Sequence, residues 1–316
     1  MCTAICYRSN ASYFGRNLDL DHGYGERVVI TPRNYEIKMR CEQPIKSHYA
    51  MIGMAAVVDN FPLYYEATNE MGLSMAGLNF PENAVYCQFA EERDNVTPFE
   101  FIPWILAQCA CVDEAKALLE KTNLVRIDFN ERLPLSPLHW MISDKGGSIA
   151  AEPLKDGLRI YDDPFDVLTN NPPFEYHAAN VSNYMGLGTG QAISQFDERV
   201  PMENHSSGMG ALGLPGDCSS ASRFVRALFV KEHSVSEDHE KSSVAQFFHI
   251  LNSVAMPKGC VRSADGLEYT RYSSCCNTDR GIYYYTTYDA PEIRAIDMHG
   301  TDLNRSRLCT YDVKGL

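Results

Sequence analysis

The sequence begins Met1-Cys2-Thr3-Ala4-Ile5-Cys6, and a second informative stretch, Phe14-Gly15-Arg16-Asn17-Leu18-Asp19, follows shortly after it. The first stretch leads into a strand-like segment over residues 3–8. Removal of Met1 would leave Cys2 with a thiol and a free α-amino group, whose ordinary pKa values are about 8.5 and about 7.7–8.0. One residue would then supply a nucleophile and a base that takes its proton. The alternative is that Cys2 is one of eleven cysteines, placed in a first strand.

The second stretch puts an arginine close to a carboxylate. Residues 15–19 have the character of a compact polar insertion between strand-like segments, in which Arg16 and Asp19 would position and tune an amine–thiol pair. A hairpin with a solvated ion pair is the alternative. Because strand alternation would place these two side chains on opposite faces, we expect a turn or bulge between them if both reach one site.

Three more polar residues stand at the ends of expected elements. Asn79 and Asn170 each end an apolar strand shortly before a proline, so each is either a turn residue or a donor to an oxyanion. Arg223 falls near the first turn of a helix expected to begin at about Ser219, where the helix dipole disfavours a cation by up to about 1 kcal/mol. This placement indicates that Arg223 serves a purpose other than stabilising the helix.

The composition is that of a folded chain with few cations. Of 316 residues, 45% are hydrophobic and 22% charged, which is ordinary for a globular protein. The net charge of −13 argues against nucleic acid or an anionic membrane as partner. The sequence contains neither an apolar run of 18 residues nor a signal-peptide pattern. We therefore expect a cytoplasmic protein with free thiols.

Familiar cofactor motifs are missing or lack their context. Residues 208–213 match G-x-G-x-x-G, but no strand precedes them and Pro215 blocks a following helix, which favours a flexible loop. The sequence has no Walker A loop, zinc-ligand spacing or G-x-S-x-G elbow. The histidines fit core or surface positions, although the sequence does not exclude a cysteine–histidine pair. No metal or organic cofactor is expected.

Strand-like segments occupy both ends of the chain, and helices lie in two blocks. The expected strands cover residues 3–8, 27–31, 51–58, 63–68, 73–78, 139–143, 148–153, 158–161, 282–288 and 292–298. The expected helices begin at 98 and 113 and cover 174–184, 219–231 and 244–254. Since no linker divides the sequence, we expect one α+β domain of residues 1–316, with two stacked sheets covered by helices.

Together these features resemble the choloylglycine hydrolase family, which contains bile salt hydrolases and penicillin V acylases. The resemblance spans nearly the whole chain. It rests on residues 1–3, 14–19, 69–73, 76–81, 138–142, 168–170, 214–217, 222–224, 247–251 and 283–285. It implies an N-terminal nucleophile hydrolase that loses Met1, an αββα four-layer sandwich, a homotetramer, and cleavage of a linear amide.

The family's catalytic set falls, residue by residue, on Cys2, Arg16, Asp19, Asn79, Asn170 and Arg223. The resemblance implies that the Cys2 amine takes the thiol proton and that Asn170 and the backbone N–H of Asn79 hold the oxyanion of a thioester-forming reaction. Asp19 would hold the amine, and the two arginines would shape the charge around the thiol.

The family's steroid-pocket positions fall on apolar or aromatic residues, as suits a sterol face, with an ordinary apolar loop as the alternative. They are Leu18, Tyr24, Val58, Tyr65, Phe129 and Leu133. Because asparagine at position 79 is typical of bile salt hydrolases, the expected substrate is a conjugated bile acid. The alternatives are a penicillin V acylase, an acyl-homoserine lactone acylase, or a non-catalytic binding protein of the same fold.

Overall fold

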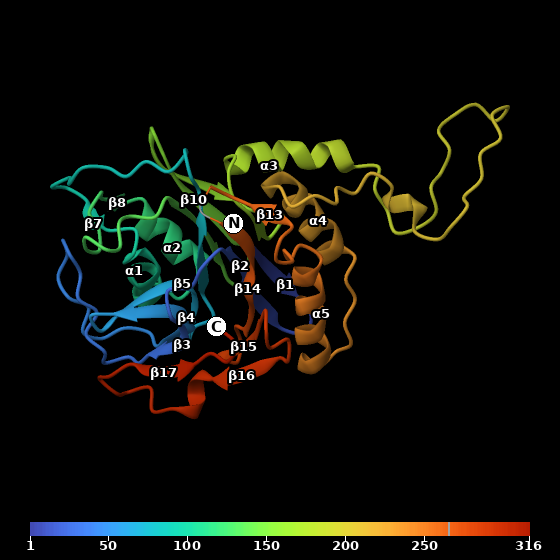
Figure 1. Cartoon of the computed structure of the whole chain (residues 1–316). Coiled ribbons are helices and arrows are strands. Elements are labelled where there is room, and N and C mark those ends of the chain that lie inside the picture. Colours follow the sequence, from blue (N-terminus) through green and yellow to red (C-terminus); the bar gives the residue numbers. More distant parts are fainter. Residues whose placement is uncertain (265) are drawn as a thin grey trace.

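Two antiparallel β-sheets pack face to face, with helices on both outer sides, in a computed structural model that describes residues 1–264 and 266–316 (Figure 1). The first sheet has the strand order β12-β1-β2-β14-β15-β16, with β13 paired to β14. Its strands are β1 (Cys2–Arg8), β2 (Ser12–Leu20), β12 (Val167–Leu168), β13 (Val261–Arg262), β14 (Leu267–Asn277), β15 (Ile282–Thr287) and β16 (Arg294–Asp297).

The second sheet has the order β11-β10-β9-β6-β5-β4-β3-β17. Its strands are β3 (Glu26–Thr31), β4 (Met51–Val58), β5 (Phe61–Asn69), β6 (Ser74–Asn79), β9 (Leu138–Ser143), β10 (Ser148–Leu154), β11 (Gly157–Asp162) and β17 (Cys309–Asp312). A small parallel pair, β7 (Asp94–Val96) and β8 (Thr122–Leu124), lies outside both sheets.

Helices cover the outer face of each sheet. The α-helices are α1 (Phe101–Gln108), α2 (Val112–Leu119), α3 (Phe174–Val181), α4 (Ser220–Glu232) and α5 (Glu240–Asn252). Figure 1 shows α1 and α2 on the side of the second sheet and α4 and α5 on the side of the first. Short 3-10 turns cover Ser182–Tyr184, Met209–Ala211 and Met298–Gly300. This αββα layering confirms the expected fold class.

The strands at the centre are buried on both faces, since each sheet has helices on one side and the other sheet on its other side. Residues 2–7 of β1 and 12–19 of β2 are all buried. Polar side chains in these strands must therefore find partners inside the protein. That requirement creates the site described below.

The expectation of a polar insertion at residues 15–19 is wrong, because these residues form the middle of β2. Gly15 permits β2 to approach β14 closely: a Cβ there would lie 2.0 Å from the carbonyl oxygen of Ser274. In the sequence these polar residues look like an exposed turn, because the groups that they bind inside the protein belong to segments far away along the chain. β14 has no counterpart among the expected strands, because most of its residues are polar.

Element ends differ from expectation by a few residues. The helix expected from residue 98 begins at Phe101, and the helix expected at 244 begins at Glu240, where His239 caps it by accepting a hydrogen bond from the N–H of Ser242. The helix expected from Ser219 is confirmed, with Ser219 as its N-cap. No α-helix in the described part of the chain combines the length and apolar character needed to cross a bilayer.

Candidate active site

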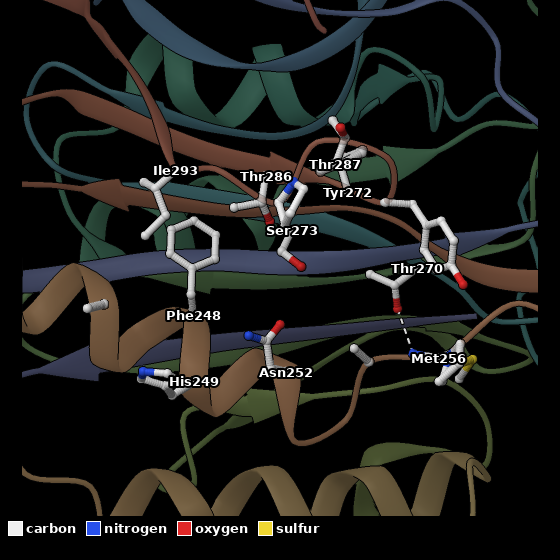
Figure 2. A pocket seen from close by; sticks show the side chains of 15 residues that line it. Phe248, His249, Asn252, Met256, Thr270, Tyr272, Ser273, Thr286, Thr287 and Ile293 are labelled. Atoms are coloured by element: carbon white, nitrogen blue, oxygen red, sulfur yellow. Dashed lines mark hydrogen bonds between the residues drawn. The ribbon is translucent and has the colours of Figure 1, made fainter. Parts of the chain in front are cut away.

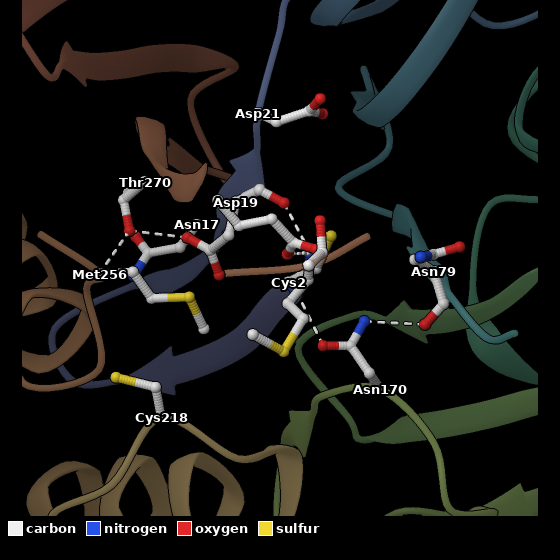
Figure 3. Close-up of polar contacts among 12 residues, drawn as sticks. Cys2, Asn17, Asp19, Asp21, Asn79, Asn170, Cys218, Met256 and Thr270 are labelled. Carbon is white, nitrogen blue, oxygen red and sulfur yellow. Dashed lines mark hydrogen bonds and ion pairs between the residues drawn. The ribbon is translucent and has the colours of Figure 1, made fainter. Parts of the chain in front are cut away.

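Cys2 lies at the start of β1, buried to 2% exposure, and pairs with Leu18 of β2. Its backbone N–H donates to Oδ1 of Asn170 at 2.8 Å. Figure 3 shows Cys2 between Asp19 and Asn170, with Asn79 beyond Asn170. The strand end therefore brings the first thiol of the chain to a cluster of polar groups from four other elements.

Asn170 follows β12 and links Cys2 to the second sheet. Its Nδ2 donates to the carbonyl oxygen of Asn79 at 2.7 Å, and one N–H of this amide remains free for a ligand. Asn79 is the last residue of β6 and lies opposite Leu138 of β9. The next residue pair along the two chains is hydrogen-bonded, since the N–H of Phe80 donates to the carbonyl oxygen of Pro137. Hydrogen-bonded and non-hydrogen-bonded pairs alternate along such a ladder, so the N–H and C=O of Asn79 both point away from β9, and the C=O meets Asn170.

Arg223, in the first turns of α4, is fully buried and ties the same groups together. Its Nη1 donates to the carbonyl oxygen of Cys2 and to Oγ1 of Thr3, the latter at 2.6 Å, and its Nη2 donates to Oδ1 of Asn170 at 2.6 Å. Burial lowers the pKa of Arg223, while Asp19 and Cys2 favour its charged form. Oδ1 of Asn170 thus accepts two hydrogen bonds, which orients the amide with Nδ2 toward Asn79.

Asp19 lies on the face of β2 that is turned toward α5. Its Oδ1 accepts from the Thr270 hydroxyl at 2.6 Å, and that hydroxyl accepts from the Met256 N–H at 2.8 Å. Oδ2 has no hydrogen-bond partner among the described residues. Burial raises the pKa of Asp19, and Arg223, the N-terminal amine and Thr270 oppose that rise.

Arg16 lies on the opposite face of β2, in the space between the sheets. Its Nη1 donates to the carbonyl oxygens of Tyr65 at 3.1 Å and Gly77 at 2.5 Å. Nη2 is buried and, within residues 1–264 and 266–316, has no partner. Burial lowers the pKa of Arg16, but the facing groups, led by Cys2, raise it overall.

The turn or bulge expected between Arg16 and Asp19 does not occur in β2. The pairing of β1 with β2 is regular from Cys2 opposite Leu18 to Arg8 opposite Ser12. A register shift lies instead in the neighbouring strand, between Thr270 and Tyr272 of β14. Both side chains flank Cys2 because it stands at the very end of its strand, where the two faces of the sheet are both within reach.

Met1 occupies the position next to the proposed nucleophile in this structure. Its ammonium group donates to the carbonyl oxygen of Asp19 and to Oε2 of Glu268, each at 2.6 Å. Glu268 is not among the expected site residues, because its contact with the N-terminus depends on the pairing of β14 with β2.

A buried network behind Asn170 was also missed by sequence reasoning. The Ser220 hydroxyl and the His177 Nε2 both lie 2.9 Å from the Asn170 carbonyl oxygen. His139 bridges the Thr169 carbonyl oxygen and Glu152, each at 2.9 Å. Burial lowers the pKa of His177, which favours its neutral form. The two histidines are buried hydrogen-bonding residues, as their sequence contexts indicate.

The six candidate substrate residues do not form one cluster. Leu18 and Tyr65 pack in or against the core between the sheets, whereas Val58, Phe129 and Leu133 belong to the cluster beneath α1 and α2. Tyr24 is 49% exposed and contacts the His22 ring.

A cavity of about 460 Å³ lies elsewhere, between α5 and the strands β14 and β15 (Figure 2). Its wall includes Thr270, the hydrogen-bond partner of Asp19, together with Phe248 and Asn252. None of the six candidate substrate residues lines this cavity in the described part of the chain. The cavity backs the site from the helix side and does not contain it.

The cluster as a whole suits attack on a carbonyl group. It holds a thiol at a chain end, a carboxylate with an unsatisfied oxygen, two buried guanidinium groups, and amide donors aimed at one region. Among the described residues, no group of three or more His, Cys, Asp or Glu side chains is arranged to hold a metal ion.

Comparison with known proteins agrees with this chemistry. Residues 2–311 match the family described as linear amide C–N hydrolases, choloylglycine hydrolase family. The chain is 50% identical to a bile salt hydrolase/transferase of Lactiplantibacillus plantarum, over 99% of this chain and 97% of that one. It is 38% identical to a conjugated bile acid hydrolase of Lactobacillus gasseri, over 98% and 100% of the two chains.

Solved structures give the same result. A variant of conjugated bile acid hydrolase from Clostridium perfringens superposes with a TM-score of 0.92 at 35% identity, covering 100% of this chain and 98% of that one. Penicillin V acylase from Agrobacterium tumefaciens, at 21% identity and a TM-score of 0.76 over 98% and 91% of the two chains, shares the fold. The chain belongs to the choloylglycine hydrolase family of linear amide C–N hydrolases.

Proposed function

We propose that this protein is a bile salt hydrolase that cleaves the amide of glycine- or taurine-conjugated bile acids. The observation that carries the proposal is the Asn170 amide, which joins the Cys2 N–H at 2.8 Å to the Asn79 carbonyl oxygen at 2.7 Å. This contact brings nucleophile and amide donors together. The relatives named bile salt hydrolase/transferase and conjugated bile acid hydrolase support the choice of substrate.

The reaction begins on a mature chain of residues 2–316, after Met1 has been removed. The α-amine of Cys2 takes the thiol proton, and the thiolate attacks the amide carbonyl carbon. Asp19 holds the resulting ammonium group, which explains why its Oδ2 is buried without a partner among the described residues. Arg16 and Arg223 stabilise the negative charge from opposite sides of β1.

The oxyanion of the tetrahedral intermediate is held by the free N–H of Asn170 Nδ2 and the backbone N–H of Asn79. The Cys2 ammonium group protonates the departing glycine or taurine nitrogen, and the C–N bond breaks to leave a thioester. Water then adds to the thioester, with the amine as base, and releases the free bile acid and the thiol. No step requires a metal or organic cofactor.

We propose that the steroid body is bound by Leu18, Tyr24, Val58, Tyr65, Phe129 and Leu133. Leu18 is the best supported of these, because it pairs directly with Cys2 across β1 and β2.

Purified protein is expected to release free glycine and taurine from glycocholate and taurocholate with a kcat/KM about 10-fold or more above that for penicillin V. An amino-acid assay run beside a penicillin V assay measures both activities. A preference for penicillin V, or for acyl-homoserine lactones in the same panel, would keep the mechanism and reject the substrate. No turnover of any of them would favour a binding protein of this fold.

We also propose that residues 1–316 form one domain and that the protein acts in the cytoplasm. All eleven cysteines are free thiols, which suits a reducing compartment. The chain contributes strands from both ends to the same sheet, since β2 pairs with β14, and β15 and β16 extend the sheet from β14 within the last fifty residues.

The protein is proposed to be a homotetramer assembled through the long arm between α3 and α4. Figure 1 shows this arm standing away from the body. Backbone hydrogen bonds join its two sides at Gly188, Gly190 and Gly210, and it exposes Ile193 and Phe196 to 82% and 71%. Exposed apolar side chains of this size favour contact with another protein surface.

Changing Ile193 and Phe196 together to serine is expected to convert the tetramer to smaller species, because it removes the apolar contacts of the arm. Light scattering coupled to size exclusion gives the mass of each form. A matched change of exposed polar residues, Glu198→Ser with Glu203→Ser, should leave the assembly intact. An unchanged mass for the Ile193/Phe196 variant would rule out the arm as the assembly contact.

A further inference from the structure

Glu66 is a buried carboxylate for which the proposed reaction has no role. It lies in β5, 2% exposed, between the two sheets. The Tyr272 hydroxyl donates to its Oε2 at 2.7 Å and the Tyr283 hydroxyl to its Oε1 at 2.5 Å. Burial raises the pKa of Glu66, and Arg16 and the two tyrosines oppose that rise. Both oxygens therefore have donors, as a buried carboxylate requires.

Glu66 faces the guanidinium group of Arg16. Nε of Arg16 lies 3.9 Å from Oε2 of Glu66, and both side chains are shielded from solvent. The hydrogen bonds of this guanidinium go to three backbone carbonyl oxygens, of Asn17, Tyr65 and Gly77, which carry no net charge. Glu66 thus supplies a full negative charge to an arginine whose Nη2 remains unpartnered among the described residues.

The buried charges around Cys2 balance when Glu66 is ionised. Two guanidinium groups, of Arg16 and Arg223, and two carboxylates, of Asp19 and Glu66, are all buried there. Transfer of the thiol proton to the Cys2 amine creates one charge of each sign and keeps the balance. Without Glu66 the thiolate would face an excess positive charge, and a more strongly stabilised thiolate is a weaker nucleophile.

We propose that Glu66 is a positioning residue, which holds Arg16 beside Cys2 and offsets its charge. This inference rests on the proposed function, because it takes Cys2 as the nucleophile. Several titratable and charged groups surround Cys2 and the Glu66–Arg16 pair. Together with these residues they are Cys2 with its amine, Arg16, Asp19, Tyr65, Glu66, Cys218, Arg223, Glu268, Tyr272 and Tyr283. Of these, Glu66 and Asp19 are the buried carboxylates paired electrostatically with Arg16.

The test is Glu66→Gln, which keeps the size of the side chain, removes its charge and replaces one of its two acceptor oxygens with an NH2 donor. We expect kcat for glycocholate to fall about 10- to 100-fold, with KM within about 2-fold, since Glu66 is only 2% exposed. The acidic limb of the pH–rate profile should move to lower pH, because loss of a nearby negative charge favours the thiolate. Glu66→Asp keeps the charge and should restore the wild-type position of this limb.

The pH dependence of Cys2 alkylation by iodoacetamide, followed by mass spectrometry of the N-terminal peptide, tests the same shift without substrate. A wild type inactive on bile salts would count against the proposed function, while this alkylation profile would still decide the role of Glu66. Unchanged profiles and a kcat within about 2-fold of wild type would overturn the inference.

Glu240→Gln is the matched control. Glu240, the first residue of α5, also accepts from a tyrosine, Tyr284 at 2.9 Å, and pairs with Arg280. It contacts Asn277 at the C-terminal end of β14, whereas Cys2 lies beside Leu18, the partner of Tyr272. The control variant should leave kcat and both pH profiles unchanged. If Glu66→Gln does not fold, Tyr283→Phe removes one hydrogen bond to the carboxylate and should lower kcat several-fold; a wild-type kcat there would likewise contradict the proposal.

Discussion

Replacing Cys2 with alanine is expected to lower kcat for glycocholate by about 10⁴-fold or more, because the substitution removes the atom that forms the thioester. Binding should persist, since the amide donors and the apolar surroundings remain. Release of free glycine measures kcat, and quenched wild-type reactions should show a bile-acyl adduct on the N-terminal peptide. The free energy of unfolding should change by less than about 1.5 kcal/mol, because only one buried sulfur atom is lost.

Cys6→Ala provides the matched control for this experiment. Cys6 lies on the same face of β1, is equally buried, and contacts Ser12 away from the site. It should retain wild-type turnover with a similar small loss of stability. Substantial activity in the Cys2 variant, or an active mature protein that still carries Met1, would contradict the mechanism, because the nitrogen of Cys2 would then be an amide that cannot take a proton.

The second large effect is expected at Asn170. Asn170→Ala removes an oxyanion donor together with the side chain that receives the Cys2 N–H and the Arg223 Nη2. We expect kcat to fall about 10²- to 10³-fold, which corresponds to the loss of one such donor, with a smaller change in KM. Steady-state kinetics with glycocholate and taurocholate measure both constants.

Two further variants distinguish the loss of the Asn170 N–H donor from the loss of the hydrogen bonds that hold Asn170 in place. Asn170→Asp keeps the acceptor oxygen but has no N–H to offer, so its kcat should be as low as that of Asn170→Ala. Ser220→Ala removes the two hydrogen bonds between the Ser220 hydroxyl and the Asn170 backbone and leaves the side-chain amide in place, so its kcat should fall by less than about 10-fold. Near-normal turnover by either Asn170 variant would exclude this side chain from the oxyanion site.

The order and spacing of a few short segments were sufficient to predict the α+β sandwich and the family. Arg223 illustrates why this succeeded: its unfavourable place near the start of a helix can be recognised from local residues, and the structure has α4 beginning where expected. Asn79, which ends β6, and Asn170, which lies two residues after β12, are likewise marked by nearby prolines. Local signals of this kind depend only on residues that are neighbours in sequence.

Arg16 and Asp19 show where this reasoning fails. Their segment resembles a solvated turn, because polar side chains are ordinarily exposed. In the structure the same residues lie in a fully buried strand, with partners on β5, β6 and β14 that are some 50 to 250 residues away in sequence. No local pattern identifies such partners, and for the same reason neither Glu66 nor Glu268 stands out in the sequence.

The sequence by itself determined the nucleophile candidate, the family and the layers of the fold, since these follow from residue type, order and the periodicity of buried positions. The tertiary structure decided how the groups meet: which face of β2 each side chain takes, which oxygen of Asn170 receives the Cys2 N–H, and which carboxylate balances Arg16. The physical reason is that buried polar groups are stable only with partners, and in a sheet those partners come from strands that are adjacent in space but remote in the chain.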